Sequence, residues 1–245
     1  MKKILKDVDV NYIQYGKGKD VILLHGWGQN IEMMKFIGDR LDGFRITIID
    51  FPGFGDSTEP PFPWTISDYT DLLYKLVKEL KIKKPIIMGH SFGGRVAIKY
   101  ASMYDVEKLI LFASPFNDND DQISIKTKIL KGLKRLPGMN KIGEFMKNFI
   151  GSSDYKKASP VMRQVLVNAI NEDLSNDAKK IVCPTLLIWG TNDEAVPVSE
   201  AKKLEKLIDD AALILLPGTH YAYIENIDRV MVILDNFLEE NKWYL

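Results

Sequence analysis

One serine in the sequence has the surroundings of a nucleophile. Ser91 lies in Gly89-His90-Ser91-Phe92-Gly93, between an apolar run at 85–88 and a helical stretch that we place at 94–103. This is the pattern G-x-S-x-G between a strand and a helix, a nucleophile elbow that holds the hydroxyl on a tight, strained turn. The glycines let neighbouring main chains approach without clashes of Cβ atoms. The first N–H groups of the helix favour a developing negative charge. The segment therefore predicts a serine that attacks a carbonyl carbon.

A serine nucleophile needs a general base, and the sequence has three histidines. His90 adjoins Ser91, but neighbouring side chains on such a turn point in different directions, so we interpret it as a packing residue. His25 follows an apolar run and is placed to shape a loop. His220 follows the last expected strand, at the edge of the sheet where we expect Ser91. Position and elimination favour His220 as the base over an ordinary surface histidine.

The imidazole needs an acid that fixes its tautomer and stabilises the imidazolium. Asp193 ends Gly190-Thr191-Asn192-Asp193, directly after an apolar run at 186–189. Acidic residues on turns are usually turn formers, but this turn follows a buried strand at the expected edge. The chain order Ser, Asp, His also agrees with the G-x-S-x-G pattern. We predict Asp193 as the acid, with Glu194 as the alternative.

The oxyanion formed by such an attack needs N–H donors. One is expected to be the main-chain N–H of Phe92, the residue after the nucleophile. The second is expected from His25-Gly26-Trp27-Gly28, where the Trp27 N–H is our candidate. Gly26 and Gly28 permit a close main-chain approach, although a flexible turn would also explain them. An exposed Trp27 indole there could also form a wall of an acyl pocket.

The elements that must position these residues alternate along the chain, in the pattern of a parallel sheet with crossover helices. Residues 8–15 alternate with period two and predict an antiparallel edge strand. Six short runs are apolar on both faces and predict buried parallel strands at 21–24, 46–49, 86–88, 109–112, 186–189 and 213–216. Helical spacing predicts helices at 66–80, 201–208 and 227–238. We expect an α/β fold with a mostly parallel sheet of seven or eight strands flanked by helices.

The alternation breaks once, between about residues 116 and 181. This segment has helical patterns but no convincing strand, and Gly138, Gly151 and Pro160 divide it into roughly three helices. A helical insertion between two strands is typical of a cap over the carboxyl edge of the sheet, where α/β folds place their sites. We therefore expect a core of residues 1–115 and 182–245, with a helical cap or lid at 116–181.

The expected cap has an excess of positive charge. Between Lys126 and Arg163 there are ten basic and two acidic residues, in a chain with 33 of each. A solvated helix surface would explain this excess. A docking face for an acidic partner, such as an acyl carrier protein, or for anionic lipid headgroups would explain it as well. The balanced net charge of the whole chain gives no field that points to nucleic acid.

Other features of the sequence bear on compartment and cofactors. The single cysteine, Cys183, cannot form an intramolecular disulfide, and we interpret it as a small buried group. Lys6, Asp7 and Asp9 interrupt the place of a signal-peptide core. The longest apolar run, Ala211–Leu216, is too short to span a bilayer. No residues have the spacing of a metal site or a phosphate loop. We expect a cytoplasmic protein without metal or cofactor.

Together these motifs resemble the α/β-hydrolase superfamily. The resemblance spans residues 8–238 apart from the cap, and it rests on His25-Gly26-Trp27-Gly28, Asp50-Phe51-Pro52-Gly53-Phe54-Gly55-Asp56-Ser57, the elbow around Ser91, Asp193 and His220. It implies a hydrolytic triad enzyme with a lid. The sequences of the first two loops and the short helical cap are similar to those of the carboxylesterases that include the biotin-pathway esterase of pimeloyl-carrier-protein methyl ester.

The residues and the resemblance together predict hydrolysis of small acyl esters through an acyl-enzyme. Dehalogenase-like relatives carry Asp where Ser91 stands and are disfavoured. Carbon–carbon bond hydrolases and perhydrolases keep a serine triad, so the sequence leaves them open as alternatives. A non-catalytic ligand-binding protein on this fold would be expected to have lost part of the triad, whereas every member is present here.

Overall fold

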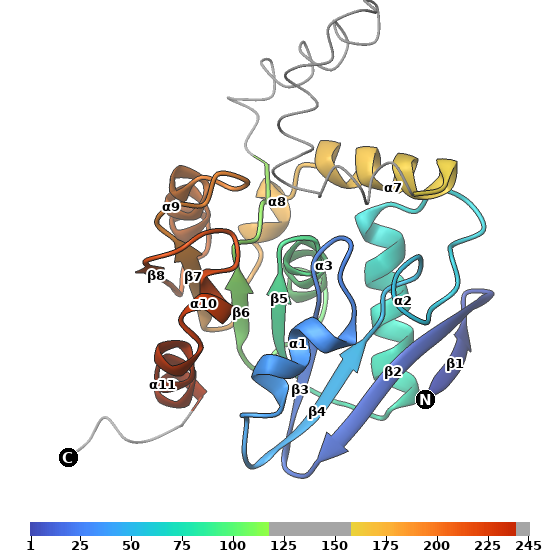
Figure 1. Ribbon diagram of the computed structural model, residues 1–245, viewed down its shortest axis with the longest axis horizontal. Coiled ribbons are helices and arrows are strands. Elements are labelled where there is room, and N and C mark those ends of the chain that lie inside the picture. Colours follow the sequence, from blue (N-terminus) through green and yellow to red (C-terminus); the bar gives the residue numbers. More distant parts are fainter. Residues whose placement is uncertain (118–157, 239–245) are drawn as a thin grey trace, which may run out of the picture.

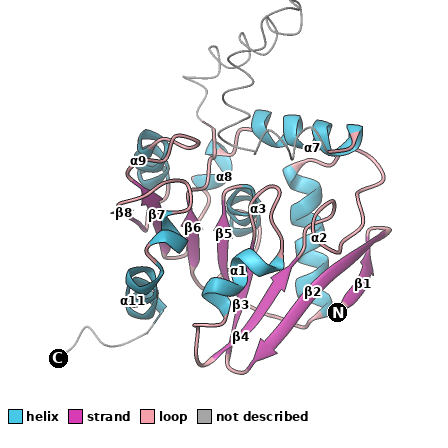
Figure 2. Cartoon of the chain, in the orientation of Figure 1, coloured by secondary structure: helices cyan, strands magenta, loops and turns pink. Residues whose placement is uncertain are grey.

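Eight strands form one sheet, drawn in magenta in Figure 2. The structure is a computed structural model that describes residues 1–117 and 158–238. The strands are β1 (Lys2–Leu5), β2 (Val8–Gly16), β3 (Lys19–Leu24), β4 (Phe44–Ile49), β5 (Ile86–His90), β6 (Leu109–Phe112), β7 (Thr185–Gly190) and β8 (Ala211–Leu216). They lie in the order β1-β2-β4-β3-β5-β6-β7-β8. β2 pairs antiparallel with β1 and β4, and the other pairs are parallel. The mostly parallel sheet confirms the expected fold class.

Helices cover both faces of this sheet (Figure 1). They are α1 (Ile31–Gly38), α2 (Ile66–Glu79), α3 (Phe92–Ala101), α7 (Pro160–Asn171), α8 (Ser175–Ala178), α9 (Val198–Leu207), α10 (Ala222–Glu225) and α11 (Ile227–Leu238). In β3, Ile22 and Leu24 pack into one core cluster with α2, α3 and α9, while Val21 and Leu23 pack into a second with α1 and α11. Strands covered on both faces must be apolar throughout, which is why they read as continuous apolar runs.

Local signals fix where two helices near the candidate site begin. Thr65 and Asp68 form a capping box at the start of α2, an arrangement in which the N-cap typically contributes about 1 kcal/mol. α3 begins at Phe92, two residues before the start that the sequence predicts. The difference arises because Ser91 makes the whole turn by itself, and because glycines at 93 and 94 are poor helix formers that hide the first turn.

Two predictions about the edges of the sheet are wrong. β2 is antiparallel as predicted, but β1 pairs with its outer side and forms the edge. Lys6 and Asp7 make the turn between them with φ of 51° and 62°, where such turns usually carry Asn or Gly, so no turn signal marks this hairpin. At the other edge β8 is only partly buried, and Leu215 is 38% exposed, because an edge strand is less completely covered than a central one.

The segment between β6 and β7 is described only in part. α7 begins at Pro160, as the sequence predicts for a helix boundary. Figure 1 shows α7 across the top of the view, on the side where β5 and β6 end. The helices expected around Gly138 and Gly151 lie outside the described residues. So do the basic residues counted between Lys126 and Arg163, except Arg163 itself, which is exposed on α7.

α7 rests on the loop that follows β4. The Ser159 hydroxyl donates to the Glu59 carboxylate at 2.7 Å, and the Asn168 amide donates to the Trp64 carbonyl oxygen at 3.3 Å. A Cβ atom on Gly53 would collide with the side chain of Met162. These contacts attach the described part of the insertion to the core near the start of α2.

The two ends of the insertion meet beside α3. The guanidinium of Arg95, a fully buried residue of α3, donates to the carbonyl oxygens of Pro115 and Glu172. Burial lowers the pKa of Arg95 to about 10. The Leu174 N–H also donates to the Phe116 carbonyl oxygen at 2.9 Å. The helix that begins at the candidate nucleophile therefore holds both ends of the insertion. Among the described residues, no helix is long and apolar enough to cross a membrane.

Candidate active site

Ser91 lies between the end of β5 and the start of α3. Its φ is 51° and its ψ is −111°, a conformation that costs a non-glycine residue on the order of 1–3 kcal/mol. The Ser91 N–H donates to the Phe112 carbonyl oxygen at 3.0 Å, which anchors the turn to β6. The strand, the strained turn and the helix therefore occur in the order that the G-x-S-x-G pattern predicts.

The two glycines of the elbow stand where main chains nearly touch. A Cβ atom on Gly89 would lie 2.7 Å from the Gly93 carbonyl oxygen. A Cβ atom on Gly93 would lie 2.4 Å from the Leu24 carbonyl oxygen and 2.6 Å from that of His25. No side chain fits at such distances, so these glycines let the start of α3 pack against the end of β3.

His220 and Asp193 form a buried pair. His220 Nδ1 lies 2.8 Å from Asp193 Oδ2, and the two residues are 8% and 6% exposed. The other carboxylate oxygen, Oδ1, accepts the N–H groups of Ala195 and Val196 at 2.9 and 2.8 Å. Three hydrogen bonds therefore fix the carboxylate and aim it at the imidazole. Glu194, the alternative acid, is exposed.

The loops that carry this pair are joined through their main chains. The Asn192 N–H donates to the Gly218 carbonyl oxygen at 2.8 Å. A Cβ atom on Gly190 would lie 2.1 Å from the Thr219 carbonyl oxygen, so only glycine permits this approach. The Glu225 carboxylate accepts the N–H and the hydroxyl of Thr219 at 2.8 and 2.6 Å. Glu225, the last residue of α10, thus fixes the position of Thr219, the residue before His220.

His220 also lies beside the nucleophile elbow. His90, the residue before Ser91, places its Nε2 3.1 Å from the main-chain oxygen of His220, and the two imidazole centroids are 4.9 Å apart. The structure therefore brings the elbow, His220 and Asp193 together, although they are far apart in the sequence. Such a set can carry out nucleophilic attack with general-base assistance.

The loop predicted to supply an oxyanion donor lies at the end of β3. Gly28 has φ 71°, a conformation that favours glycine in the turn that it forms with Trp27. Trp27 is 8% exposed, so its indole is buried and not an exposed wall. Its ring packs edge-on against Phe54 and Phe92, with centroids 4.9 and 5.6 Å away, because the loop after β4 and the start of α3 enclose it.

His25 has the loop-shaping role that its position predicts. Its Nε2 accepts the Phe51 N–H at 3.0 Å, while its Nδ1 lies 2.7 Å from the Gly26 carbonyl oxygen. Burial lowers the pKa of His25 to about 4, so the ring stays neutral at neutral pH. His25 therefore joins the loops after β3 and β4 and is not available as a base.

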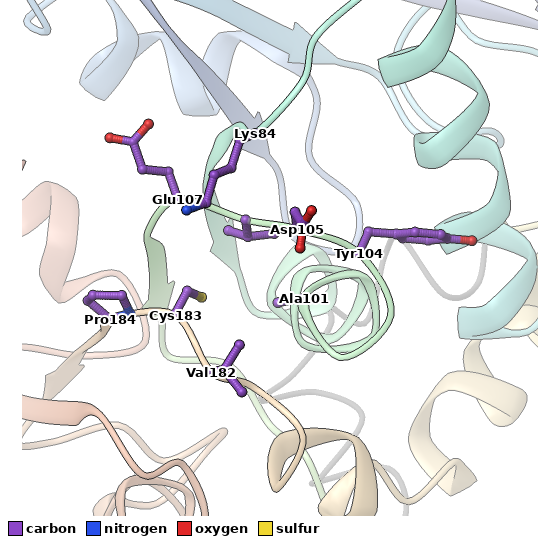
Figure 3. A pocket seen from close by; sticks show the side chains of 9 residues that line it. Lys84, Ala101, Tyr104, Asp105, Glu107, Val182, Cys183 and Pro184 are labelled. Carbon is purple, nitrogen blue, oxygen red and sulfur yellow. The ribbon is translucent and has the colours of Figure 1, made fainter.

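A pocket of about 180 Å³ lies at the opposite edge of the sheet (Figure 3). It is lined by residues that precede β5, β6 and β7, including Lys84, Glu107 and Cys183. Burial raises the pKa of the Cys183 thiol, which disfavours the nucleophilic thiolate. The pocket therefore holds no partner for Ser91. Among the described residues, no three His, Cys, Asp or Glu side chains are grouped as metal ligands.

Two residues near the site were not singled out by the sequence analysis. Gln29 accepts the Gly26 N–H at 2.8 Å and lies 3.2 Å from His90 Nδ1. Gly190 makes the close approach to the loop that carries His220. A glycine at the end of a strand is a signal of such an approach. No sequence signal marks Gln29, because its contacts depend on the fold.

Comparisons with known proteins agree with this fold. The chain resembles the AB hydrolase superfamily protein YisY of Bacillus subtilis, with 26% identity over 91% of this chain and 92% of that protein. It is 28% identical to the pimeloyl-[acyl-carrier protein] methyl ester esterase of Proteus mirabilis, over 87% of this chain and 90% of that protein. A solved esterase from Exiguobacterium antarcticum superposes with a TM-score of 0.78 at 21% identity, and 98% of each chain is covered.

A family model gives the assignment itself. The model of the alpha/beta hydrolase family matches residues 21–231, which include β3, the elbow, the insertion and the loops of Asp193 and His220. The matched range covers most of the chain, and the eight-stranded sheet described above agrees with it. The chain therefore belongs to the alpha/beta hydrolase family.

Proposed function

We propose that the chain is a serine esterase that cleaves carboxylic esters through an acyl-enzyme. Ser91 is the nucleophile, His220 the general base, and Asp193 the acid that orients His220. The observation that carries this proposal is the buried 2.8 Å contact between His220 Nδ1 and Asp193 Oδ2, beside a serine with φ of 51°. Because Nδ1 faces the carboxylate, Nε2 is the nitrogen left to accept a proton.

The proposed reaction has two similar steps. In the first, the Ser91 oxygen attacks the ester carbonyl carbon while His220 Nε2 takes the hydroxyl proton. The N–H groups of Trp27 and Phe92 stabilise the oxyanion, and His220 then returns the proton to the departing alcohol. In the second step, water attacks the acyl-enzyme with the same proton transfers and releases the acid. The reaction requires no cofactor or metal.

The proposal is tested with a fluorophosphonate probe, which reacts with activated serines. We expect the wild-type protein to be labelled at one site per chain, and Ser91→Ala to lose both the label and the hydrolysis of p-nitrophenyl butyrate. Ser102→Ala is the matched control, since Ser102 lies on the C-cap of α3, at the far end from Ser91. An adduct that persists in Ser91→Ala would refute the assignment of the nucleophile.

The choice among esters, peracids and carbon–carbon bonds is tested with the same purified protein. A series of p-nitrophenyl esters with graded acyl chains measures ester hydrolysis directly. Addition of acetate and hydrogen peroxide tests for perhydrolysis, and a vinylogous diketone tests for carbon–carbon cleavage. Ester turnover that exceeds the other two activities in kcat/KM supports the proposal, and the reverse order favours an alternative chemistry on the same residues.

A carrier-protein ester is the more specific substrate that we propose. The support is the similarity to an esterase whose name includes an acyl-carrier-protein ester, and the excess of basic residues between Lys126 and Arg163. Reversal of Lys131, Lys134 and Arg135 to Glu should raise KM for an acyl-carrier-protein ester and leave p-nitrophenyl butyrate turnover unchanged. These three residues lie outside the described part of the chain. Equal effects on both substrates would contradict carrier docking.

A further inference from the structure

One buried side chain connects the two loops that flank the candidate nucleophile. His90 is 1% exposed. Its Nε2 lies 3.1 Å from the main-chain oxygen of His220, and its Nδ1 lies 3.2 Å from Gln29 Oε1. Gln29 Oε1 in turn accepts the N–H of Gly26 at 2.8 Å. A continuous set of contacts therefore runs from the loop of the base to the loop of the proposed oxyanion donor Trp27.

The space around His90 is shaped to hold this ring. A Cβ atom on Gly26 would lie 2.7 Å from His90 Nδ1, so a larger residue at position 26 would displace the imidazole. On its other side the ring contacts Tyr223 and Tyr221, with centroids 4.7 and 5.5 Å away. Gly26 therefore permits a side-chain contact, in addition to the main-chain approach for which the sequence predicted it.

The hydrogen-bond partners define the protonation of His90. The main-chain oxygen of His220 can only accept, so Nε2 of His90 must carry the proton if the two are bonded. In the neutral ring Nδ1 is then an acceptor, as Gln29 Oε1 is, so the 3.2 Å approach between these two atoms is a packing contact and not a hydrogen bond. Burial lowers the pKa of His90 well below its ordinary 6.5, and the neighbouring His220 and His25 lower it further. A neutral ring at this place does not repel the imidazolium that His220 becomes during catalysis, whereas a charged ring would.

We propose that His90 is a positioning residue that fixes the main chain of His220 relative to the Gly26 loop, through the Nε2 hydrogen bond on one side and the packing of the ring against Gly26 on the other. The inference rests on the ester hydrolysis proposed above. Asp193 orients the imidazole ring of His220, but it does not hold the main chain that carries the ring. His90 supplies that restraint from β5, directly beside the nucleophile. The separation between the base and the oxyanion loop is thereby set by one buried side chain.

Three substitutions separate the two nitrogen atoms of His90. Glutamine can place its amide N–H near the position of Nε2, asparagine can place its own near Nδ1, and leucine can do neither. We expect His90→Gln to keep kcat for p-nitrophenyl butyrate within about 3-fold of the wild type, because one net hydrogen bond is worth only about 0.5–1.5 kcal/mol. His90→Asn and His90→Leu should lose about 10-fold in kcat with KM unchanged.

The outcomes that overturn the inference are equally specific. Equal loss of kcat in His90→Gln and His90→Leu at unchanged melting temperature would mean that the Nε2 donor has no special role. Unchanged kcat in all three variants would also refute it. If His90→Leu does not fold, His90→Gln and His90→Asn make the same comparison, because only the glutamine can donate to the main-chain oxygen of His220. Equal kcat in these two variants would then refute the inference.

The fluorophosphonate probe keeps this test distinct from the test of the proposed function. A wild-type protein that is neither labelled nor active would refute the hydrolase mechanism and leave nothing for His90 to position. If the wild type is labelled at Ser91, the labelling rate provides a second measurement of serine activation. We expect this rate to fall in His90→Leu and to recover in His90→Gln, in parallel with kcat.

Discussion

Substitution of Asp193 by Asn tests the catalytic proposal most directly, because the structure predicts how the new amide will sit. The amide oxygen can replace Oδ1 and accept from Ala195 and Val196, or it can face His220. The second orientation turns the NH₂ group toward two main-chain donors and leaves both unsatisfied. Each unsatisfied buried donor costs about 1–3 kcal/mol, so the first orientation should dominate.

The favoured orientation has a chemical consequence for His220. With the NH₂ group facing it, Nδ1 must accept a hydrogen bond, and the proton of the neutral ring moves to Nε2. In that tautomer the imidazole cannot take the proton of the Ser91 hydroxyl. The corresponding substitution in a serine protease lowers kcat by about 10⁴. We expect a loss of about 10³–10⁴ in kcat here, which corresponds to about 4–5.5 kcal/mol in activation free energy.

The assay is steady-state hydrolysis of p-nitrophenyl butyrate, with melting temperatures measured for each variant. Glu194→Gln is the matched control, because it makes the same change of charge at the adjacent, exposed residue. We expect this variant to keep kcat within about 2-fold, since exposed charges interact weakly. If Asp193→Asn kept more than a tenth of the wild-type kcat, the assignment of the acid would be refuted. Loss of activity in Glu194→Gln would transfer the role to Glu194.

Three further predictions concern stability. Arg95→Met should lower the free energy of unfolding by about 2–5 kcal/mol in thermal denaturation, since two buried carbonyl groups lose a charged donor. The control is Lys75→Met at an exposed position, which should change the free energy of unfolding by less than about 0.5 kcal/mol. Gly190→Ala should destabilise more than Gly43→Ala, because position 43 has φ 81° but open space, whereas position 190 meets a main chain; similar melting temperatures would contradict this. Because the pKa of His25 is lowered from 6.5 to about 4, the unfolded state binds an extra proton between these pH values. The free energy of unfolding should therefore decrease as the pH is lowered from 6.5 to about 4, by at most about 1.4 kcal/mol per pH unit for this group, and His25→Gln should flatten the slope in chemical denaturation.

The central strands and the three triad candidates could be predicted from the sequence for one physical reason. A strand covered on both faces must be apolar throughout, so each buried strand can be recognised in the sequence as a short run of apolar residues. The residues that follow such runs lie at one edge of a parallel sheet, which is where Ser91, Asp193 and His220 stand. β1 was missed because a short edge strand may carry lysines and an exposed Ile4, and such a pattern resembles a loop.

The contacts of His90 and Gln29 could not be predicted, because nothing local determines them. The two residues are 61 positions apart, and His90 and His220 are 130 apart. Their distances depend on the register of three neighbouring elements, which a pattern of residue types does not specify. The burial of Trp27 could not be predicted for the same reason, since the rings that enclose it come from the loop after β4 and from the start of α3.

The glycines around the candidate site explain how loops can hold side chains with the precision that catalysis needs. Gly93 brings the elbow against the end of β3, Gly190 brings the loop of Asp193 against that of His220, and Gly26 admits His90. At each of these positions a Cβ atom would lie within 2.7 Å of its neighbour. Each contact therefore removes freedom from a loop without the use of a flexible side chain. The loops of Ser91, His220, Asp193 and Trp27 become one packed unit at the edge of the sheet, and a change in one should displace the others.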